Sequence, residues 1–184
     1  MRINILIGGA AGQGINKISE IVSKVMNEYG YYTFNYRDYP SLIRGGHNFN
    51  ILSISDTLVG SYESKLDGII AMDEKTVKLH KKQLKKTGFI ITNKGFENMG
   101  RNLNVAQSGA LIKVFGMDKQ LIINEVNNQF HNEESNKAAE TGYQSQITKF
   151  KLLKLNNKIQ KIIGNAGIAI GAINSGINLY IAYP

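Results

Sequence analysis

The hydrophobic pattern of the first 36 residues predicts a strand, a glycine-rich turn, a helix and a second strand. Residues 3–9 are an apolar run that ends in glycine, as expected of a buried strand. Apolar residues then recur at helical spacing from Ile15 to Met26, and Gly30 supplies a helix stop. The aromatic segment 31–36 has strand composition. This order predicts a βαβ unit whose strands pair in parallel through a right-handed crossover.

The middle of the chain repeats strand and helix patterns. Segments 48–55 and 58–62 look like a strand pair joined by a tight turn, which makes the predicted sheet mixed. Segments 67–73 and 88–93 predict two more buried strands, and the lysine-rich segment 74–86 between them predicts a helix. The fold class is therefore α/β: a three-layer α/β/α Rossmann-like domain with a mostly parallel, mixed sheet.

The last third of the chain predicts helices and then a change of composition. Segments 104–116 and 119–131 have helical spacing, and a third helix is expected over 135–141, with a pattern that can continue past Gly142. Segment 149–162 fits either a short helix or a linker.

An uncharged tail of small and apolar residues begins near Ile163. We assign residues 1–162 to one domain and residues 163–184 to the first segment of a second domain, which the chain truncates. The tail is expected to close on a strand over 179–184.

Composition and charge limit the class of protein. The apolar runs are shorter than the roughly 18 residues of a membrane span, and the N-terminal run is too short for a signal peptide, so the expected location is the cytoplasm. The absence of cysteine excludes disulfides and an iron–sulfur cluster held by this chain. The net charge of +8 fits either a solvated lysine-rich surface or an anionic partner. Without tryptophan, or basic residues alternating with aromatic ones, a nucleic-acid platform is disfavoured.

The first turn, "GGAAGQG" at 8–14, points the free N–H groups and the dipole of the next helix at any ligand above it. That arrangement suits a phosphate or a carboxylate. The motif departs from G-x-G-x-x-G because Lys17 holds the third glycine position, and the second strand ends at Arg37, one residue before Asp38. Two alternatives stay open: a purely structural turn, and a stand-alone NADP-binding domain with Arg37 on the 2′-phosphate.

A second polar loop, "YPSLIRGGHN" at 39–48, follows the second strand and so reaches the same sheet edge. Gly45 and Gly46 let the chain turn, and Arg44 is a planar cation that can grip phosphate or carboxylate. His47 completes the cluster. The alternative is an internal ion pair for Arg44 and a core position for His47.

Three other polar positions have simpler interpretations. Asp73 closes a strand and is expected to cap the next helix. His80 lies among lysines and is expected to be exposed. His131 with Glu133 and Glu134 lacks a second histidine, so no metal site is expected.

Four segments resemble, in order and spacing, the γ-type domain of 2-oxoacid:ferredoxin (acceptor) oxidoreductases: 9–15, 39–48, 67–73 and 136–144. The tail 164–184 resembles the start of the α domain of the same enzymes. A γ-type domain joined to an α domain resembles an N-terminal fragment of the fused α subunit of the two-subunit type.

The resemblance implies an oxidative decarboxylation in which a 2-oxoacid, CoA and oxidised ferredoxin give acyl-CoA, CO₂ and reduced ferredoxin. It places thiamine diphosphate between the α domain and a separate β subunit, and the iron–sulfur clusters in other domains or subunits. It implies no catalytic residue and no metal in this chain, which alone should be inactive. The expected partners are the rest of the α domain, the β subunit, ferredoxin indirectly, and a second copy of the chain, with no nucleic acid and no membrane.

Carried onto this sequence, the family pattern gives six candidates for contact with CoA phosphates or a subunit interface: Gly12, Gln13, Gly14, Arg44, Gly45 and Gly46. Ala11 stands where many separate γ subunits have glycine; it resembles the fused type and narrows access to the backbone. A basic interaction module at 74–86 is a further alternative. The choice among pyruvate, 2-oxoglutarate and branched-chain oxoacids stays open.

Overall fold

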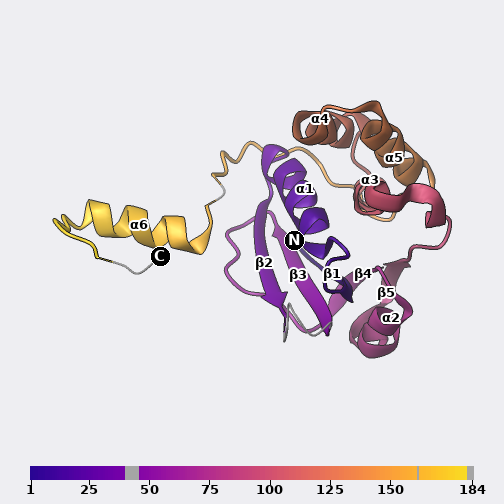
Figure 1. The fold of residues 1–184 in the computed structure, drawn as a ribbon, viewed down its shortest axis with the longest axis horizontal. Coiled ribbons are helices and arrows are strands. Elements are labelled where there is room, and N and C mark those ends of the chain that lie inside the picture. The colour runs from indigo at the N-terminus through magenta and orange to yellow at the C-terminus, as the bar shows by residue number, and fades with distance from the viewer. Residues whose placement is uncertain (40–45, 161, 182–184) are drawn as a thin grey trace.

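A five-stranded mixed sheet forms the centre of the computed structural model, which describes residues 1–39, 46–160 and 162–181 (Figure 1). The strands lie in the order β2-β3-β1-β4-β5. β1 pairs with β3 antiparallel and with β4 parallel; β2 pairs with β3 antiparallel, and β5 with β4 parallel. Their bounds are Arg2–Ala10 (β1), Tyr32–Asp38 (β2), His47–Ser55 (β3), Leu66–Ala71 (β4) and Leu84–Ile91 (β5).

Helices cover the two faces of this sheet unequally. Among the described residues, α1 and α3 pack on one face of the sheet, and the short helix α2 packs on the other. The helices and helical turns are α1 (Ile15–Glu28), α2 (Glu74–His80), η1 (Lys81–Gln83), η2 (Glu97–Asn102), α3 (Leu103–Val114), α4 (Lys119–Phe130), α5 (Glu133–Gln144) and α6 (Gly164–Asn174). The α/β class and the mixed sheet are thus confirmed, with parallel pairings making up half of the sheet.

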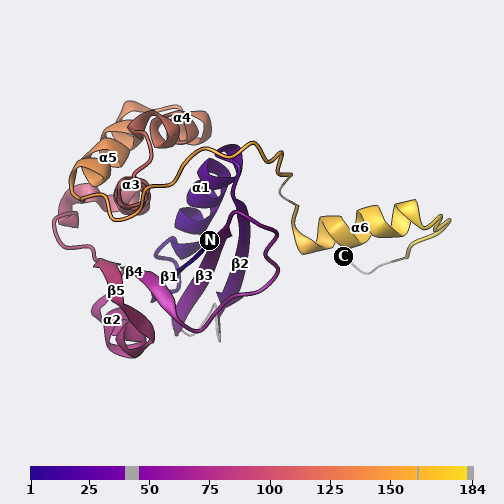
Figure 2. The same cartoon turned by 180° about the vertical axis from the view of Figure 1, so that it is seen from behind.

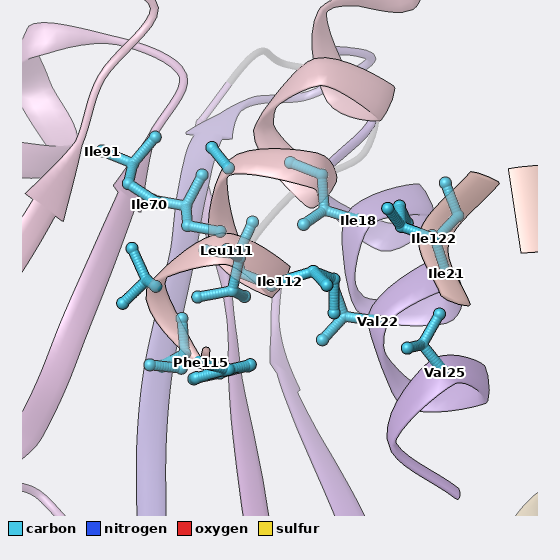
Figure 3. Close-up of a cluster of buried hydrophobic side chains, with 14 of the residues drawn as sticks. Ile18, Ile21, Val22, Val25, Ile70, Ile91, Leu111, Ile112, Phe115 and Ile122 are labelled. Carbon is cyan, nitrogen blue, oxygen red and sulfur yellow. The ribbon is translucent and has the colours of Figure 1, made fainter. Parts of the chain in front are cut away.

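The main core lies between the sheet and helices α1 and α3 (Figure 3). The apolar residues that recur at helical spacing between Ile15 and Met26 are buried on one side of α1, where the helix packs against α3. A smaller cluster on the opposite face joins Leu6, Ile51 and Ile69 to Val77 of α2. Burial of this apolar surface holds the layers together, at roughly 25 cal/mol for each Å² removed from water.

Two predicted strand pairings are wrong. β1 and β2 do not pair, because β3 lies between them and is antiparallel to both. The predicted strand at 58–62 is absent: residues 58–65 form no strand. Since β3 already has β1 and β2 on its two edges, no edge remains for a further partner.

The lysine-rich segment is helical only over its first half. α2 ends at His80, and after the turn η1 the strand β5 begins at Leu84 rather than at 88. The earlier start has a tertiary cause, because Leu84 pairs with Leu66 of β4 ahead of a bulge. The helix predictions for α3, α4 and α5 are confirmed, and α5 continues past Gly142.

Between α5 and α6 the described residues form no helix or strand, although this segment is attached to the domain. The Leu155 N–H donates to the Tyr29 carbonyl, and the Tyr31 hydroxyl donates to the Leu153 carbonyl. α6 then projects away from the domain, and none of its residues is buried (Figures 1 and 2). The strand expected at the end of the tail is not present over 177–181, and the remaining residues of that prediction lie outside the described part.

Over the described residues, no helix has the length and apolar character needed to cross a membrane.

Candidate functional site

The turn after β1 exposes the amino end of α1 at the sheet edge where the parallel strands end. Gly12 and Gly14 have φ of 87° and 84°, in the left-handed region that glycine adopts most easily. Gly14 precedes the helix without any side-chain cap, and the first helical turn carries no acidic residue. The free N–H groups of α1 therefore favour an anion at this edge.

Gln13 stabilises this turn through two hydrogen bonds to the backbone of Ala10. Its Oε1 accepts a hydrogen bond of 2.7 Å from the Ala10 N–H, and the Gln13 N–H donates to the Ala10 carbonyl at 3.2 Å. The amide oxygen of Gln13 is thus committed to the shape of the turn rather than open to a ligand.

A cavity of about 430 Å³, here called the Arg37 cavity, lies between this turn and the end of β2. Arg37 is exposed, and its side chain makes no ion pair or hydrogen bond with another described residue. An arginine side chain beside a helix amino end is suited to phosphate or carboxylate. The residues used below line it: Gly12, Gly14, Asn16, Arg37, Asn48 and Asn50.

Two asparagines of β3 form the floor of the Arg37 cavity. Asn50 pairs with Arg37 across the sheet, and its Nδ2 donates to Asn16 Oδ1 at 3.0 Å and to Ser19 Oγ at 2.8 Å. Asn48 is 3% exposed, and its Oδ1 has no partner among the described residues. Asn50 therefore fastens α1 to the sheet, whereas Asn48 leaves a buried acceptor unused.

A second cavity of about 410 Å³ lies on the other side of the same turn. Met72, Arg101 and Asn104 line it together with Gly12 to Gly14. A Cβ atom at Gly14 would come within 2.7 Å of Asn104 Nδ2, the end of a side chain that can move away, so it is the φ of 84° that favours glycine at this position.

The six predicted contact residues divide into three groups. Gly12, Gln13 and Gly14 lie at the sheet edge as predicted, although their contact with a ligand stays a prediction. Arg44 and Gly45 lie outside the described residues. Gly46 precedes β3 and does not line either cavity.

Sequence reasoning missed Asn16, Asn48 and Asn50 as cavity residues and considered Arg37 only for NADP. The signal was available in "HNFN" at 47–50, where two asparagines occupy alternate positions of a buried strand. Alternation puts both on one face, and a polar pair on a core-facing side is unusual enough to mark a site.

His47 faces the opposite side of the sheet, where it meets His80. Their Nε2 atoms are 2.8 Å apart, and His80 Nδ1 lies 2.9 Å from Gln83 Oε1. Because an amide oxygen only accepts, His80 Nδ1 carries the proton, His47 Nε2 donates to His80, and His47 Nδ1 is left as a buried acceptor without a described partner. The prediction that His80 is exposed is therefore wrong.

Burial and the neighbouring His80 lower the pKa of His47 below its usual 6.5, and Lys75 adds to this, whereas Asp73 and Asp38 oppose it. The unfolded chain then binds more protons than the folded one below about pH 6.5. We expect stability to fall as the pH drops from 6.5 towards the lowered folded pKa, and to fall less in His47→Gln.

Thermal unfolding of both proteins between pH 7.5 and 5 measures this difference. His131→Asn is the matched control, since His131 is exposed and caps α4 in the left-handed conformation that asparagine tolerates. Equal losses in the parent and in His47→Gln would contradict a role for His47.

The predicted cap on α2 is confirmed. Asp73 caps α2, accepting from the Thr76 N–H at 2.8 Å and from the Thr76 hydroxyl at 2.7 Å. Within the described residues, no three histidine, acidic or cysteine side chains converge as metal ligands, around His131 or elsewhere.

Comparison with known proteins identifies the family to which this chain belongs. The sequence pattern of the family described as pyruvate ferredoxin/flavodoxin oxidoreductase matches residues 4–175. The chain belongs to this family. One relative is the α subunit of a 2-oxoacid:ferredoxin oxidoreductase from Sulfolobus sp. It is 38% identical to this chain over 97 residues, which make up 53% of this chain and 15% of the relative.

Solved structures share the family fold. A 2-oxoglutarate:ferredoxin oxidoreductase from Magnetococcus marinus superposes with a TM-score of 0.77 at 15% identity, over 96% of this chain and 37% of that one. The γ subunit of a keto/oxoacid ferredoxin oxidoreductase from Geobacter sulfurreducens gives 0.61 at 20% identity, over 78% of this chain and 95% of that one. The chain therefore spans well under half the length of the larger proteins it matches, whereas it matches nearly the whole of a separate γ subunit.

Proposed function

We propose that this chain is the γ-type part of an enzyme that oxidatively decarboxylates a 2-oxoacid with CoA and reduces ferredoxin. The observation that carries the proposal is the family match over residues 4–175, on a domain whose fold is that of separate γ subunits. In this proposal thiamine diphosphate and the iron–sulfur clusters belong to other domains or subunits, and the chain, which has no cysteine, is inactive alone. A cytoplasmic location stays a prediction.

The site supports a CoA-facing role. The cavity is lined by Arg37, whose side chain has no partner among the described residues, by the uncapped amino end of α1 and by Asn48 with its buried acceptor. Together they offer donors and an acceptor to a phosphorylated ligand. The homologous structure from Magnetococcus marinus has CoA and succinyl-CoA bound. We place the CoA-facing surface of this chain at the Gly12–Gly14 turn.

The tail belongs to the same proposal. We propose that residues 163–184 are the first segment of an α-type domain. The γ subunit matches 78% of this chain, whereas the longer Magnetococcus chain matches 96%. The exposed side chains of Ile168, Ile173 and Leu179 would then pack on the rest of that domain or on a β subunit.

Calorimetric titration with CoA, NADP and a short oligonucleotide tests the proposed function. We expect CoA to bind and the other two to bind weakly or not at all. Tight NADP binding without CoA binding would instead support the dinucleotide alternative, for which Arg37 is well placed. An oligonucleotide affinity that falls steeply with salt would support the basic module of α2.

Arg44→Ala tests the second loop. In the complete enzyme we expect an increase of the KM for CoA of about tenfold, or weaker subunit assembly, because a charge-assisted hydrogen bond to phosphate is lost. The isolated chain should stay folded. Steady-state kinetics and gel filtration measure the two effects, and an unchanged KM with unchanged assembly would remove Arg44 from the site.

A further inference from the structure

The outer side of α2 brings cationic and apolar side chains together in one small area. Thr76 and His80 are buried against the sheet, so the other side of the helix faces outwards. The exposed residues on that side are here called the α2 basic patch: Lys75, Lys78, Leu79 and Lys82. Residues three and four apart are neighbours on a helix surface, so these four form one continuous area. Both views place α2 apart from the other α-helices (Figures 1 and 2).

The positive charges of the α2 basic patch are not balanced within the domain. Lys85 pairs with Asp67 at 2.8 Å, whereas none of the three lysines of the patch forms an ion pair with a described residue. Like charges three and four residues apart on a helix repel one another. Lys75 also lies in the first turn of α2, where the helix dipole disfavours a cation. Carboxylates from outside the domain would relieve both unfavourable interactions.

Leu79 distinguishes this patch from a plain cluster of charges. Its side chain is 52% exposed, with Lys75 four residues before it and Lys82 three residues after it. An apolar side chain surrounded by charged ones has the arrangement of a protein–protein contact, in which an apolar centre is enclosed by a polar rim. The patch therefore favours a protein surface that carries both carboxylates and an apolar group.

Two other anionic surfaces fit the patch less well. Segment 74–86 has no arginine, phenylalanine, tyrosine or tryptophan, the side chains that most often contact or stack on bases. A helix that binds a membrane surface inserts a broad apolar face. The other apolar side chain of α2, Val77, packs instead against the smaller core cluster, which leaves Leu79 alone on the outside.

We propose that the α2 basic patch docks an acidic segment of another protein, with carboxylates on its three lysines and an apolar side chain on Leu79. The patch lies on the opposite face of the sheet from the Arg37 cavity, so this contact is separate from the proposed CoA-facing function. Ion pairs between exposed groups are individually weak and are screened by salt. The contact is therefore reversible and sensitive to ionic strength.

Fluorescence anisotropy of labelled peptides, titrated with the full 184-residue chain, tests the inference. One peptide carries glutamates with leucines at helical spacing, and the other has serine in place of each leucine and the same charge. We expect the leucine peptide to bind about fivefold more tightly, because only it can bury apolar surface against Leu79. The affinity for both peptides should fall as the salt concentration is raised.

Two variants test the lysines and the leucine separately. The patch variant, Lys75→Gln with Lys78→Gln and Lys82→Gln, should bind the leucine peptide about tenfold more weakly and depend less on salt. The matched control removes the same charge from three exposed lysines between α5 and α6: Lys151→Gln with Lys154→Gln and Lys158→Gln. This control should bind within about twofold of the parent.

Leu79→Ser should bind both peptides equally and keep the salt dependence of the parent. Thermal unfolding checks that each variant is folded. If the patch variant does not fold, the comparison of the two peptides on the parent and on Leu79→Ser still decides the inference.

Three outcomes would overturn the inference. Equal losses in the patch variant and in the control variant would show that only net charge matters. Equal affinity of the parent for the two peptides would exclude an apolar centre at Leu79. The third outcome is that a duplex oligonucleotide, or vesicles of phosphatidylserine and phosphatidylcholine, bind the parent more tightly than the leucine peptide and lose this affinity in the patch variant. The CoA titration of the parent is independent of these results, so the proposed function stands or fails separately.

Discussion

Phe115→Ala is expected to lower the free energy of unfolding by about 4 kcal/mol, because truncating a fully buried phenylalanine removes apolar burial and leaves a cavity. Phe115 is fully buried at the end of α3, where it belongs to the main core (Figure 3). Its ring meets Phe150 edge-on at 6.0 Å, and its carbonyl accepts from the Leu152 N–H at 3.1 Å. The substitution should therefore also loosen the segment that follows α5.

Chemical denaturation followed by circular dichroism measures the loss of stability. Hydrogen exchange at the amides of Lys149, Phe150 and Leu152 measures the loosening, since all three donate to carbonyls at the end of α3. Leu153→Ala is the matched control, because Leu153 belongs to the same segment and is 66% exposed. A loss below about 1 kcal/mol in Phe115→Ala would mean that this ring is not central to the core.

Gly142→Ala is expected to destabilise the protein by about 2 kcal/mol, although alanine is the better helix former. α3 and α5 cross with their backbones in contact: a methyl group on Gly142 would meet the Ala106 carbonyl, and one on Gly109 would meet the Ala139 carbonyl. Overpacking of this kind costs about 3 kcal/mol, and the gain in helix propensity offsets about 1 kcal/mol of it.

The control for this experiment is Gly171→Ala in α6. Gly171 is also inside a helix, but nothing lies within 4 Å of the place where its Cβ would be. The Gly171→Ala substitution gains only the higher helix propensity of alanine, so no loss of stability is expected. Denaturation curves measure the free energy of unfolding of the two variants. Equal stability of Gly142→Ala and Gly171→Ala would show that α3 and α5 can move apart without destabilising the protein.

Local patterns were sufficient for the elements whose residues contact near neighbours in sequence. The stripe of α1 was visible because a 3.6-residue period fixes which side chains share a face. The cap on α2 was visible because Asp73 needs only Thr76, three residues away.

Strand order could not be derived in this way. The insertion of β3 between β1 and β2 depends on pairings such as Leu6 with Ile51, far apart in the chain, and a strand pattern carries no information about its neighbours. The same limit hid the Arg37 cavity, because the pairing of Arg37 with Asn50 creates it. In the tail, glycine, alanine and isoleucine are compatible with helix or strand, and the absence of burial removes the periodicity that separates them.

The attachment of the tail has a mechanical consequence. Leu153 and Leu155 are hydrogen-bonded to the turn at which β2 begins, whereas Arg37 lies near the end of the same strand. A strand of seven residues at about 3.3 Å each makes β2 a strut of roughly 20 Å between these two points. A domain that begins with α6 would therefore be attached at one end of β2, while the proposed ligand cavity lies at the other end, about 20 Å away. The two sites share one strand although they lie too far apart for direct contact.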